Sequence, residues 1–306
     1  MSDEEWSDFT CFEGNANALR VLTHQFNGKR PGGFTLTYST IASFVKYPDE
    51  SSLPEGKQKF GFFQSEKETF RTIASTLELV KVSESPLKYR RHPLVYLVEA
   101  TDDICYQIMD IEDGHKLKIL AYPETEHLFL SFFDKDSDRR ILNSIGENLT
   151  IVNDYNERVA YLRAMVIGKL IIECAGIFLD NYIRIEADEE ISSLFKGLAD
   201  PSRSAMNAVK EISLEKIYND SSVVEIEIAG YKILDTLLET FISAMMEPDS
   251  YLSSKLLSLI PSQYKGNGET TYNKIQTVVD FVSGMTDLYA LDLYQKITGM
   301  NLPGIA

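Results

Sequence analysis

The sequence predicts an all-α or mostly α protein. Helical periodicity, with apolar residues three or four positions apart, recurs along the 306-residue chain from residue 2 to residue 298. Alternation of apolar and acidic residues, typical of a β-strand, occurs only at residues 223–228, and that stretch is also compatible with a helix. We therefore expect helix in more than half of the residues and at most one small sheet.

Composition is that of a soluble globular protein, with 44% hydrophobic and 25% charged residues. The formal net charge is −16 and the isoelectric point is about 4.7. This negative field opposes nonspecific binding to nucleic acid or to an anionic membrane. An anionic substrate would therefore need a local basic pocket, a metal ion, or both.

Three cysteines, Cys11, Cys105 and Cys174, lie far apart in the sequence. They form neither a CxxC metal pattern nor a disulfide framework, which favours a reducing cytoplasm. The longest apolar run, residues 164–179, contains Lys169 and Glu173 and is too short to span a bilayer. We expect a cytoplasmic protein with no membrane partner.

Ser2 and Glu5 have capping-box spacing, so a helix is expected to begin almost at once. Residues 12–25 are expected to continue as helix, with Gly14 as a weak point. Asn15 in this stretch is, by itself, most simply a capping or surface amide.

A second helix is expected from a cap at Thr35 or Thr37 to Pro48, with Lys46 and Tyr47 as its last residues. A lysine at that end would complement the helix dipole. After a polar loop at residues 49–56, Lys59 precedes an aromatic cluster that we assign to the core, namely Phe60, Phe62 and Phe63.

Ser65 and Glu68 form a second capping box at the start of another expected helix. The densest basic cluster follows, consisting of Lys88, Arg90 and Arg91. It is compatible with phosphate binding and with a subunit contact.

Residues 91–114 are the strongest helix prediction, with Pro93 in the first turn and Gly114 just past the end. The broad apolar side comprises Leu94, Leu97, Thr101, Ile104, Cys105, Ile108 and Ile111. The opposite stripe comprises Glu99, Asp102, Tyr106, Asp110 and Asp113. Like charges one turn apart are unfavourable. The stripe is either a solvated face or a face that holds a cation or polar ligand, and the spacing leaves both open.

The second half of the chain is expected to be helical as well. Asn153 is expected to cap a long helix to about residue 183, and Pro201 to break the helices of residues 188–211. Further helices are expected at 230–246, 251–260 and 271–298, the last with a joint at Gly284.

Five segments resemble the deoxyguanosine triphosphate triphosphohydrolases, a bacterial branch of the HD-domain phosphohydrolase superfamily. They are FEGNA (12–16), LTYSTIASFVKYP (36–48), KFGFFQSEKETF (59–70), VEATDDICYQIMDIEDG (98–114) and VSGMTDLYALDLYQKITG (282–299). The resemblance implies a multi-helix HD-type fold that hydrolyses dGTP, or another dNTP, to the deoxynucleoside and inorganic triphosphate. It also implies a divalent metal, Mn²⁺ or Mg²⁺, and a homo-oligomer.

The same resemblance assigns roles to particular residues. Asp102 is implied as a metal ligand, Tyr106 as the catalytic residue approaching the phosphates, and Asp110 as the partner of the sugar 3′-hydroxyl. The implied triphosphate-binding residues are Asn15, Lys46, Tyr47 and Lys59.

Domain organisation follows from the resemblance too: residues 1–150 correspond to the C-terminal part of the catalytic core, and residues 151–306 to a helical C-terminal region packed on it. The family's other metal ligands, a histidine and a His-Asp pair, have no match among His24, His92, His115 and His127, none of which precedes an aspartate. We therefore expect a fold that lacks the family's N-terminal helices and is inactive alone. The alternative is a non-catalytic remnant that binds nucleotide or forms oligomers.

Overall fold

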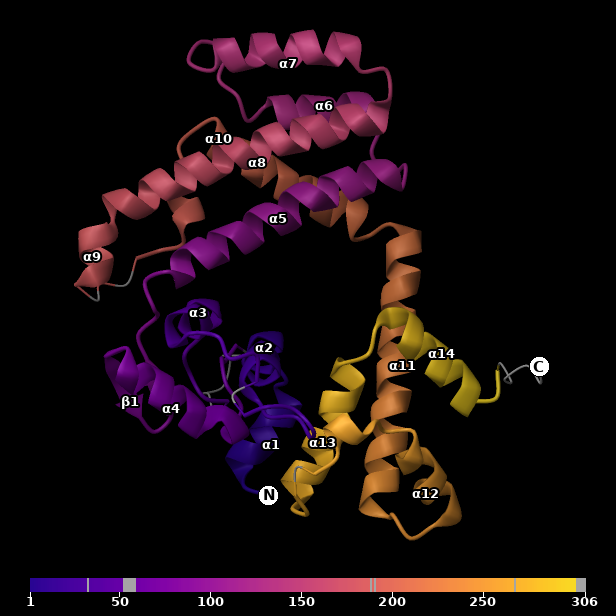
Figure 1. The fold of residues 1–306 in the computed structure, drawn as a ribbon. Coiled ribbons are helices and arrows are strands. Elements are labelled where there is room, and N and C mark those ends of the chain that lie inside the picture. The colour runs from indigo at the N-terminus through magenta and orange to yellow at the C-terminus, as the bar shows by residue number, and fades with distance from the viewer. Residues whose placement is uncertain (32, 52–58, 188, 190, 267, 301–306) are drawn as a thin grey trace. The chain divides into compact units, whose positions relative to one another are not determined.

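The computed structural model describes residues 1–31, 33–51, 59–187, 189, 191–266 and 268–300. More than half of these residues are helical, and the described part contains one two-stranded sheet, so the mostly α prediction is confirmed. The chain forms two compact units. We call residues 1–91 with 225–306 the terminal unit, and residues 92–224 the middle unit. Figure 1 shows both, coloured along the sequence.

The sheet is a hairpin in the terminal unit, at residues where the sequence pattern predicts no strand. Strands β1 (Lys81–Glu84) and β2 (Leu87–Tyr89) pair antiparallel, and β2 alternates buried Leu87 and Tyr89 with less buried Lys88. Residues 223–228 instead belong to a helix, α11 (Ser221–Met246). Their acidic residues are compatible with either periodicity, and the long uninterrupted helix that follows decides for the helix.

The other elements of the terminal unit are helices from both ends of the chain. They are α1 (Asp3–Thr10), α2 (Gly14–Thr23), α3 (Tyr38–Phe44), the 3₁₀ turn η1 (Gln64–Glu66), α4 (Lys67–Thr76), α12 (Tyr251–Ser258), the 3₁₀ turn η4 (Ser262–Tyr264), α13 (Thr271–Ser283) and α14 (Asp287–Ile297). As predicted, Phe60, Phe62 and Phe63 are core residues. The predicted joint at Gly284 separates α13 from α14, and Thr286 caps α14.

In the N-terminal part, two predicted helix caps are confirmed, whereas one predicted helix end and one predicted capping box are wrong. The Ser2–Glu5 capping box is present, and Thr37 caps α3. However, α3 ends at Phe44, because Pro48 disfavours helical geometry just before it, so Lys46 and Tyr47 lie in the irregular segment after the helix. The predicted capping box at Ser65 is wrong: Ser65 lies in a 3₁₀ turn and its hydroxyl donates to Glu66 at 2.7 Å.

A buried ionic cluster joins the two sequence ends within the terminal unit. Arg20 on α2 donates from Nε and Nη2 to the Asp280 carboxylate on α13, at 2.6 and 2.7 Å, and from Nη1 to Glu66 at 2.6 Å. All three side chains are almost completely buried. Burial lowers the pKa of Arg20, but its bonds to Asp280 and Glu66 outweigh this effect and keep the guanidinium charged. Burial also raises the pKa of Glu66, and Arg20 offsets part of that rise.

A second buried contact joins the same ends. Asp8 on α1 accepts hydrogen bonds through Oδ2 from Tyr272 on α13 at 2.6 Å and from the backbone N–H of Gln64 at 2.7 Å. Burial raises the pKa of the Asp8 carboxyl, and these hydrogen bonds offset part of the rise. The N-terminal helices are therefore attached to α13 by polar groups that are withdrawn from water.

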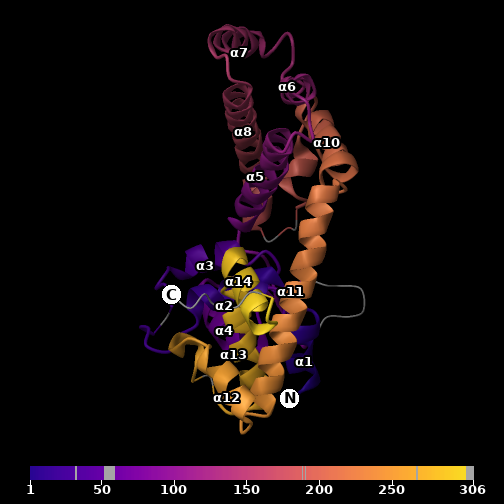
Figure 2. The same ribbon diagram turned by 90° about the vertical axis from the view of Figure 1, so that its right-hand side faces the viewer.

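The middle unit is a helical assembly built around two long helices. Its elements are α5 (Val95–Lys116), α6 (Tyr122–Leu130), α7 (Arg139–Ile151), α8 (Tyr155–Asp180), α9 (Tyr182–Glu186), the 3₁₀ turn η2 (Leu194–Gly197), α10 (Ser202–Ile212) and the π-helical turn η3 (Ser213–Ile217). Helices α5 and α8 run side by side in both ribbon views (Figures 1 and 2). Their facing sides supply the core of this unit, including Ile104 and Ile108 from α5 and Leu162 and Val166 from α8. None of the helices described combines the length and apolar character needed to cross a membrane.

Helix α5 differs from its prediction at both ends. It starts two residues after Pro93 and continues through Gly114 to Lys116. Gly114 lies inside the helix and not at a turn, and it packs closely on Ile217: a Cβ there would lie 2.9 Å from Cδ1 of Ile217, so that side chain would have to shift. The buried side is also narrower than predicted, because Leu94 and Thr101 are exposed. Helix α8 is capped by Asp154 and not by Asn153. The Asp154 carboxylate accepts a hydrogen bond from the backbone N–H of Glu157.

Candidate functional site

In the middle unit, Asp102, Tyr106 and Asp110 lie one turn apart on α5, so they share one side of the helix. Tyr106 is 68% exposed, and the two carboxylates are partly buried. A large aromatic side chain held out between two carboxylates leaves its hydroxyl available to a ligand. These three residues form the candidate site of the middle unit, and from here on the name acidic stripe refers to them alone, without Glu99 and Asp113.

Asp110 has a partner that the sequence does not indicate. The hydroxyl of Tyr218, just after η3, donates a hydrogen bond to Oδ2 of Asp110. Burial, followed by this bond and the charge of Asp110, raises the pKa of Tyr218 to about 12, so the phenol stays protonated and remains a donor. Tyr218 therefore fixes the orientation of the Asp110 carboxylate. Because the two residues are 108 positions apart, no local pattern could have revealed the pair.

Glu112 is an acidic residue of α5 that belongs to the packing and not to the stripe. It is buried, pairs with Arg163 on α8, and contacts Nζ of Lys116 at 3.2 Å. This ion pair fixes how α5 lies along α8. The carboxylates on α5 thus divide into a buried one that holds the helix and more accessible ones on the stripe.

Within the described ranges, no three residues among His, Cys, Asp and Glu come together as a group that could hold a metal ion. Asp102 is thus one potential ligand without two others near it in that part of the chain. A single carboxylate with water rarely holds a transition metal tightly. The residues described do not form a metal site by themselves.

In the terminal unit, the structure brings together Tyr47 and Lys59, which the sequence separates by a loop. Nζ of Lys59 lies 5.3 Å from the centroid of the Tyr47 ring, and Cζ of Arg91 lies 5.6 Å from it. Cation–π contacts therefore hold two positive side chains at one aromatic ring. We call Tyr47, Lys59 and Arg91 the cationic cluster.

Two of the basic residues at 88–91 have different contacts. Arg91 contacts the Tyr47 ring, whereas Lys88 pairs with Asp49 at 3.1 Å and so helps to hold the hairpin. Lys46, the residue before Tyr47, is partly buried.

Asn15 is engaged with its own helix terminus. Its side-chain amide donates to Glu13 Oε1 at 2.6 Å, and the same carboxylate caps the backbone N–H of Asn15. These contacts agree with the simpler interpretation of Asn15 as a capping amide. The amide oxygen of Asn15 is not used in this bond.

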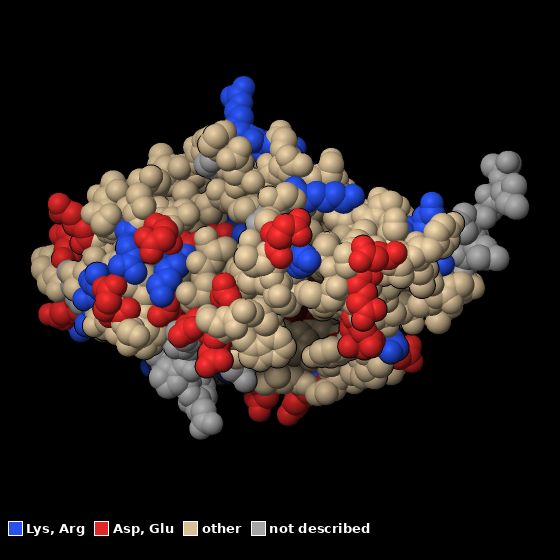
Figure 3. Space-filling view, turned by 90° about the horizontal axis from the view of Figure 1, so that it is seen from below, with Lys and Arg blue, Asp and Glu red and all other residues tan. Residues whose placement is uncertain are grey.

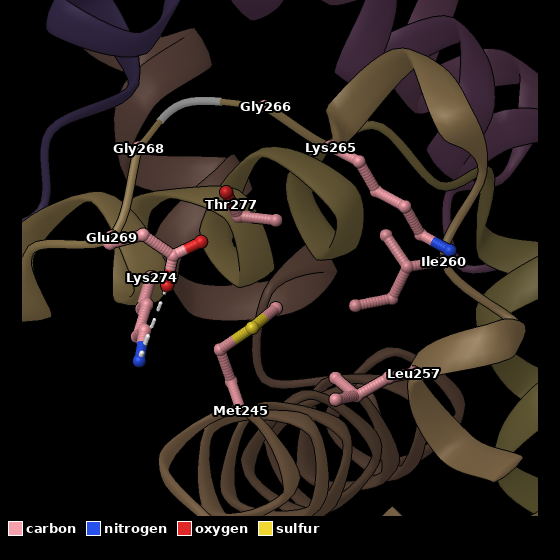
Figure 4. A pocket seen from close by; sticks show the side chains of 9 residues that line it. All are labelled: Met245, Leu257, Ile260, Lys265, Gly266, Gly268, Glu269, Lys274 and Thr277. Atoms are coloured by element: carbon pink, nitrogen blue, oxygen red, sulfur yellow. Dashed lines mark ion pairs between the residues drawn. The ribbon is translucent and has the colours of Figure 1, made fainter. Parts of the chain in front are cut away.

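One cavity of the terminal unit contains none of the predicted site residues. It has a volume of about 450 Å³ and lies between α11, α12 and α13. Figure 4 shows Met245, Leu257 and Ile260 along its apolar side, with Lys274 paired to Glu269 at 3.8 Å across from them. On the face of the described residues drawn in Figure 3, acidic and basic side chains are interspersed and do not form a broad basic surface.

Comparison with known proteins identifies the class of protein to which the chain belongs. Residues 197–296 match the model of the phosphohydrolase-associated domain. This match covers α10, α11, α12 and α13 and most of α14, and it places the chain among the proteins that carry this helical domain.

Relatives that match along nearly the whole chain narrow the class to a family. A deoxyguanosinetriphosphate triphosphohydrolase-like protein of Synechocystis is 35% identical over 97% of this chain and 67% of its own length. A protein of the same description from Pseudomonas aeruginosa is 34% identical over 99% of this chain and 69% of its own length. A deoxyguanosinetriphosphate triphosphohydrolase of Yersinia enterocolitica is 24% identical over 95% of this chain and 64% of its own length. The chain belongs to the deoxyguanosinetriphosphate triphosphohydrolase-like family, which confirms the resemblance, and it spans about two thirds of the length of these relatives.

Proposed function

We propose that this chain binds a deoxynucleoside triphosphate, with dGTP as the preferred candidate, and contributes to its hydrolysis to deoxynucleoside and inorganic triphosphate. The observation that carries the proposal is the identity of 34–35% along nearly the whole chain to relatives described as deoxyguanosinetriphosphate triphosphohydrolase-like. Two local arrangements support it: the cationic cluster and the acidic stripe.

The cationic cluster is suited to the triphosphate. Lys59 beside Tyr47 offers an ammonium donor, and Lys46 and Asn15 are the other predicted phosphate-binding residues of this unit. A triphosphate carries several negative charges, and in a chain of net charge −16 a local group of cations is needed to attract it. Charge-assisted hydrogen bonds from such groups are stronger than neutral ones.

The acidic stripe of the middle unit, taken by itself, has side chains that suit a deoxynucleotide. Asp110, oriented by Tyr218, can accept a hydrogen bond from the 3′-hydroxyl of a deoxyribose. Tyr106 can donate its hydroxyl to a phosphate oxygen, which neutralises charge as the phosphate–oxygen bond breaks. Asp102 would contribute one ligand to the divalent metal of the intact family, and that metal would polarise a phosphate and position the attacking water when bound.

We expect the chain by itself not to hydrolyse dGTP at a useful rate. Metal-assisted hydrolysis needs a site with fixed coordination, and Asp102 has no two companion ligands among the residues described. The test is to incubate the purified chain with dGTP and Mn²⁺ or Mg²⁺ and to measure deoxyguanosine and triphosphate. The assay is then repeated with the unmatched third of the Synechocystis relative added in trans. Clear turnover by the chain alone would contradict this expectation.

A second candidate is a module that binds nucleotide or forms oligomers without catalysis. The lack of a three-residue metal group within the described ranges favours it. Metal content at saturating Mn²⁺, measured in the complemented preparation, separates the two. Stoichiometric, tightly held metal would support the catalytic proposal, and nucleotide binding without metal or turnover would support the module. Homo-oligomer formation and a cytoplasmic location stay predictions.

Asp110→Ala is expected to weaken binding or turnover of a dNTP about ten- to a hundredfold in a catalytically complemented preparation. The reason is loss of a charge-assisted hydrogen bond, worth about 1.5–3 kcal/mol, to the sugar 3′-hydroxyl. A dideoxynucleoside triphosphate lacks that hydroxyl, so its kinetics should change little. Asp113→Ala, an exposed carboxylate on the same helix, is the matched control. Equal losses with both nucleotides would show that Asp110 does not contact the 3′-hydroxyl.

A further inference from the structure

We propose that a second cavity in the terminal unit binds a small aromatic anion, a planar ring that carries a phosphate or carboxylate. The cavity has a volume of about 530 Å³ and lies among α2, the segment that follows it, η4 and the end of α13. This volume is within the range of small-molecule sites in proteins. None of the residues predicted to bind substrate or metal lines it.

Aromatic rings from distant parts of the chain form one side of this cavity. His24 and Phe26 meet edge to face at 4.8 Å between centroids, and Phe26 meets Tyr264 edge to face at 5.7 Å. Phe34, 65% exposed, also lines the cavity. Aromatic faces of this kind accept a planar ring by stacking, and they do so without requiring a particular base or substituent.

Two adjacent cations line the same cavity. Lys29 and Arg30 are exposed, and neither side chain has an ion-pair partner among the residues that the structure describes. The protein has 46 acidic and 30 basic residues, so its mean field repels anions and an anionic ligand needs local cations such as these. Lysine and arginine together provide strong donors to a phosphate or carboxylate.

One acidic residue, Asp280, lines the cavity, and its charge is partly screened. Both of its carboxylate oxygens accept hydrogen bonds from Arg20, and Gln276 donates to it at 3.0 Å. Arg20 is shared with Glu66, so Lys29 and Arg30 supply the further positive charge that an anion needs. Ring-stacking surfaces and unpaired cations then meet in one cavity, which defines the class of ligand.

The test uses the whole chain and three probes in isothermal titration calorimetry: AMP, adenosine and ribose 5-phosphate. AMP has both ring and anion, and it has no triphosphate to be hydrolysed. We expect AMP to bind about tenfold or more tightly than adenosine, which lacks the anion, and than ribose 5-phosphate, which lacks the ring. Equal affinities of the three probes would overturn the proposal.

Variants locate the binding. Lys29→Gln combined with Arg30→Gln should weaken AMP about ten- to a hundredfold, and Phe34→Leu about fivefold or more. All three residues are exposed, so these variants should fold. Lys232→Gln and Tyr251→Leu, also exposed and outside the cavity, are the matched controls and should bind AMP normally. AMP affinity that is unchanged in the Lys29/Arg30 variant would overturn the proposal.

Lys59→Ala separates this site from the proposed substrate site. It should leave AMP binding in place, because Lys59 does not line the cavity. If Lys59→Ala abolished AMP binding while the Lys29/Arg30 variant kept it, the nucleotide would be bound at the cationic cluster, and the cavity assignment would be wrong while the proposed function stood. Failure of dGTP hydrolysis in a complemented preparation would leave the cavity result unaffected.

Discussion

Arg20→Met is expected to lower the free energy of unfolding of the terminal unit by about 3–5 kcal/mol, because it leaves the carboxylates of Glu66 and Asp280 buried without their cation. Methionine fills much of the same space, so the loss reports the missing charge more than a cavity. Chemical denaturation followed by fluorescence measures it. Trp6, the single tryptophan, lies in α1 and therefore reports on the unit that contains Arg20.

Two further variants make this measurement specific. Arg71→Met removes a surface arginine of the same unit that pairs with Glu68 and Glu84, and it should change stability little. The triple variant Arg20→Met, Glu66→Gln, Asp280→Asn removes the stranded charges as well and should recover much of the loss. A small effect of Arg20→Met, similar to that of Arg71→Met, would show that the buried cluster does not hold α2 to α13.

Asp102→Ala is expected to abolish metal binding and dGTP turnover in a catalytically complemented preparation. Removal of one ligand from a small coordination set leaves the metal weakly held, and the water that it positions is lost with it. Metal content and product formation are both measured. Circular dichroism checks that the helices persist, as expected for a partly buried residue on α5.

Matched variants on the same helix test whether the effect belongs to the stripe. Tyr106→Phe keeps the ring and removes the hydroxyl, so kcat should fall while metal binding persists. Asp113→Ala removes an exposed carboxylate three residues past Asp110 and should leave both intact. If Asp102→Ala and Tyr106→Phe were as active as the unchanged chain, the acidic stripe would be a solvated helix face.

Sequence reasoning succeeds here where the cause is local. The capping box of Ser2 and Glu5, the Thr37 cap and the core position of Phe62 all follow from neighbouring residues. The helical class follows in the same way, because periodicity repeats in each segment. The stripe of α5 is likewise fixed by spacing along one helix.

Tertiary packing explains what the sequence does not predict. Gly114 has the chemistry of a helix end, yet it lies inside α5, where it packs closely on the side chain of Ile217. The hydrogen bond from Tyr218 to Asp110 and the pair between Arg20 and Asp280 join residues separated by 108 and 260 positions. Such pairings depend on the fold as a whole, and one sequence carries no local signal of them.

The ionic pair between α2 and α13 also has a consequence for the order in which the protein can form during synthesis. Arg20 leaves the ribosome 260 residues before Asp280. At about 5–20 residues per second, this leaves its charge without that partner for roughly 10–50 s. The middle unit is one continuous segment, residues 92–224, and all of its own contacts are available earlier. We therefore expect the middle unit to fold first. Residues 1–91 of the terminal unit stay incompletely folded, and accessible to chaperones, until α13 has been synthesised.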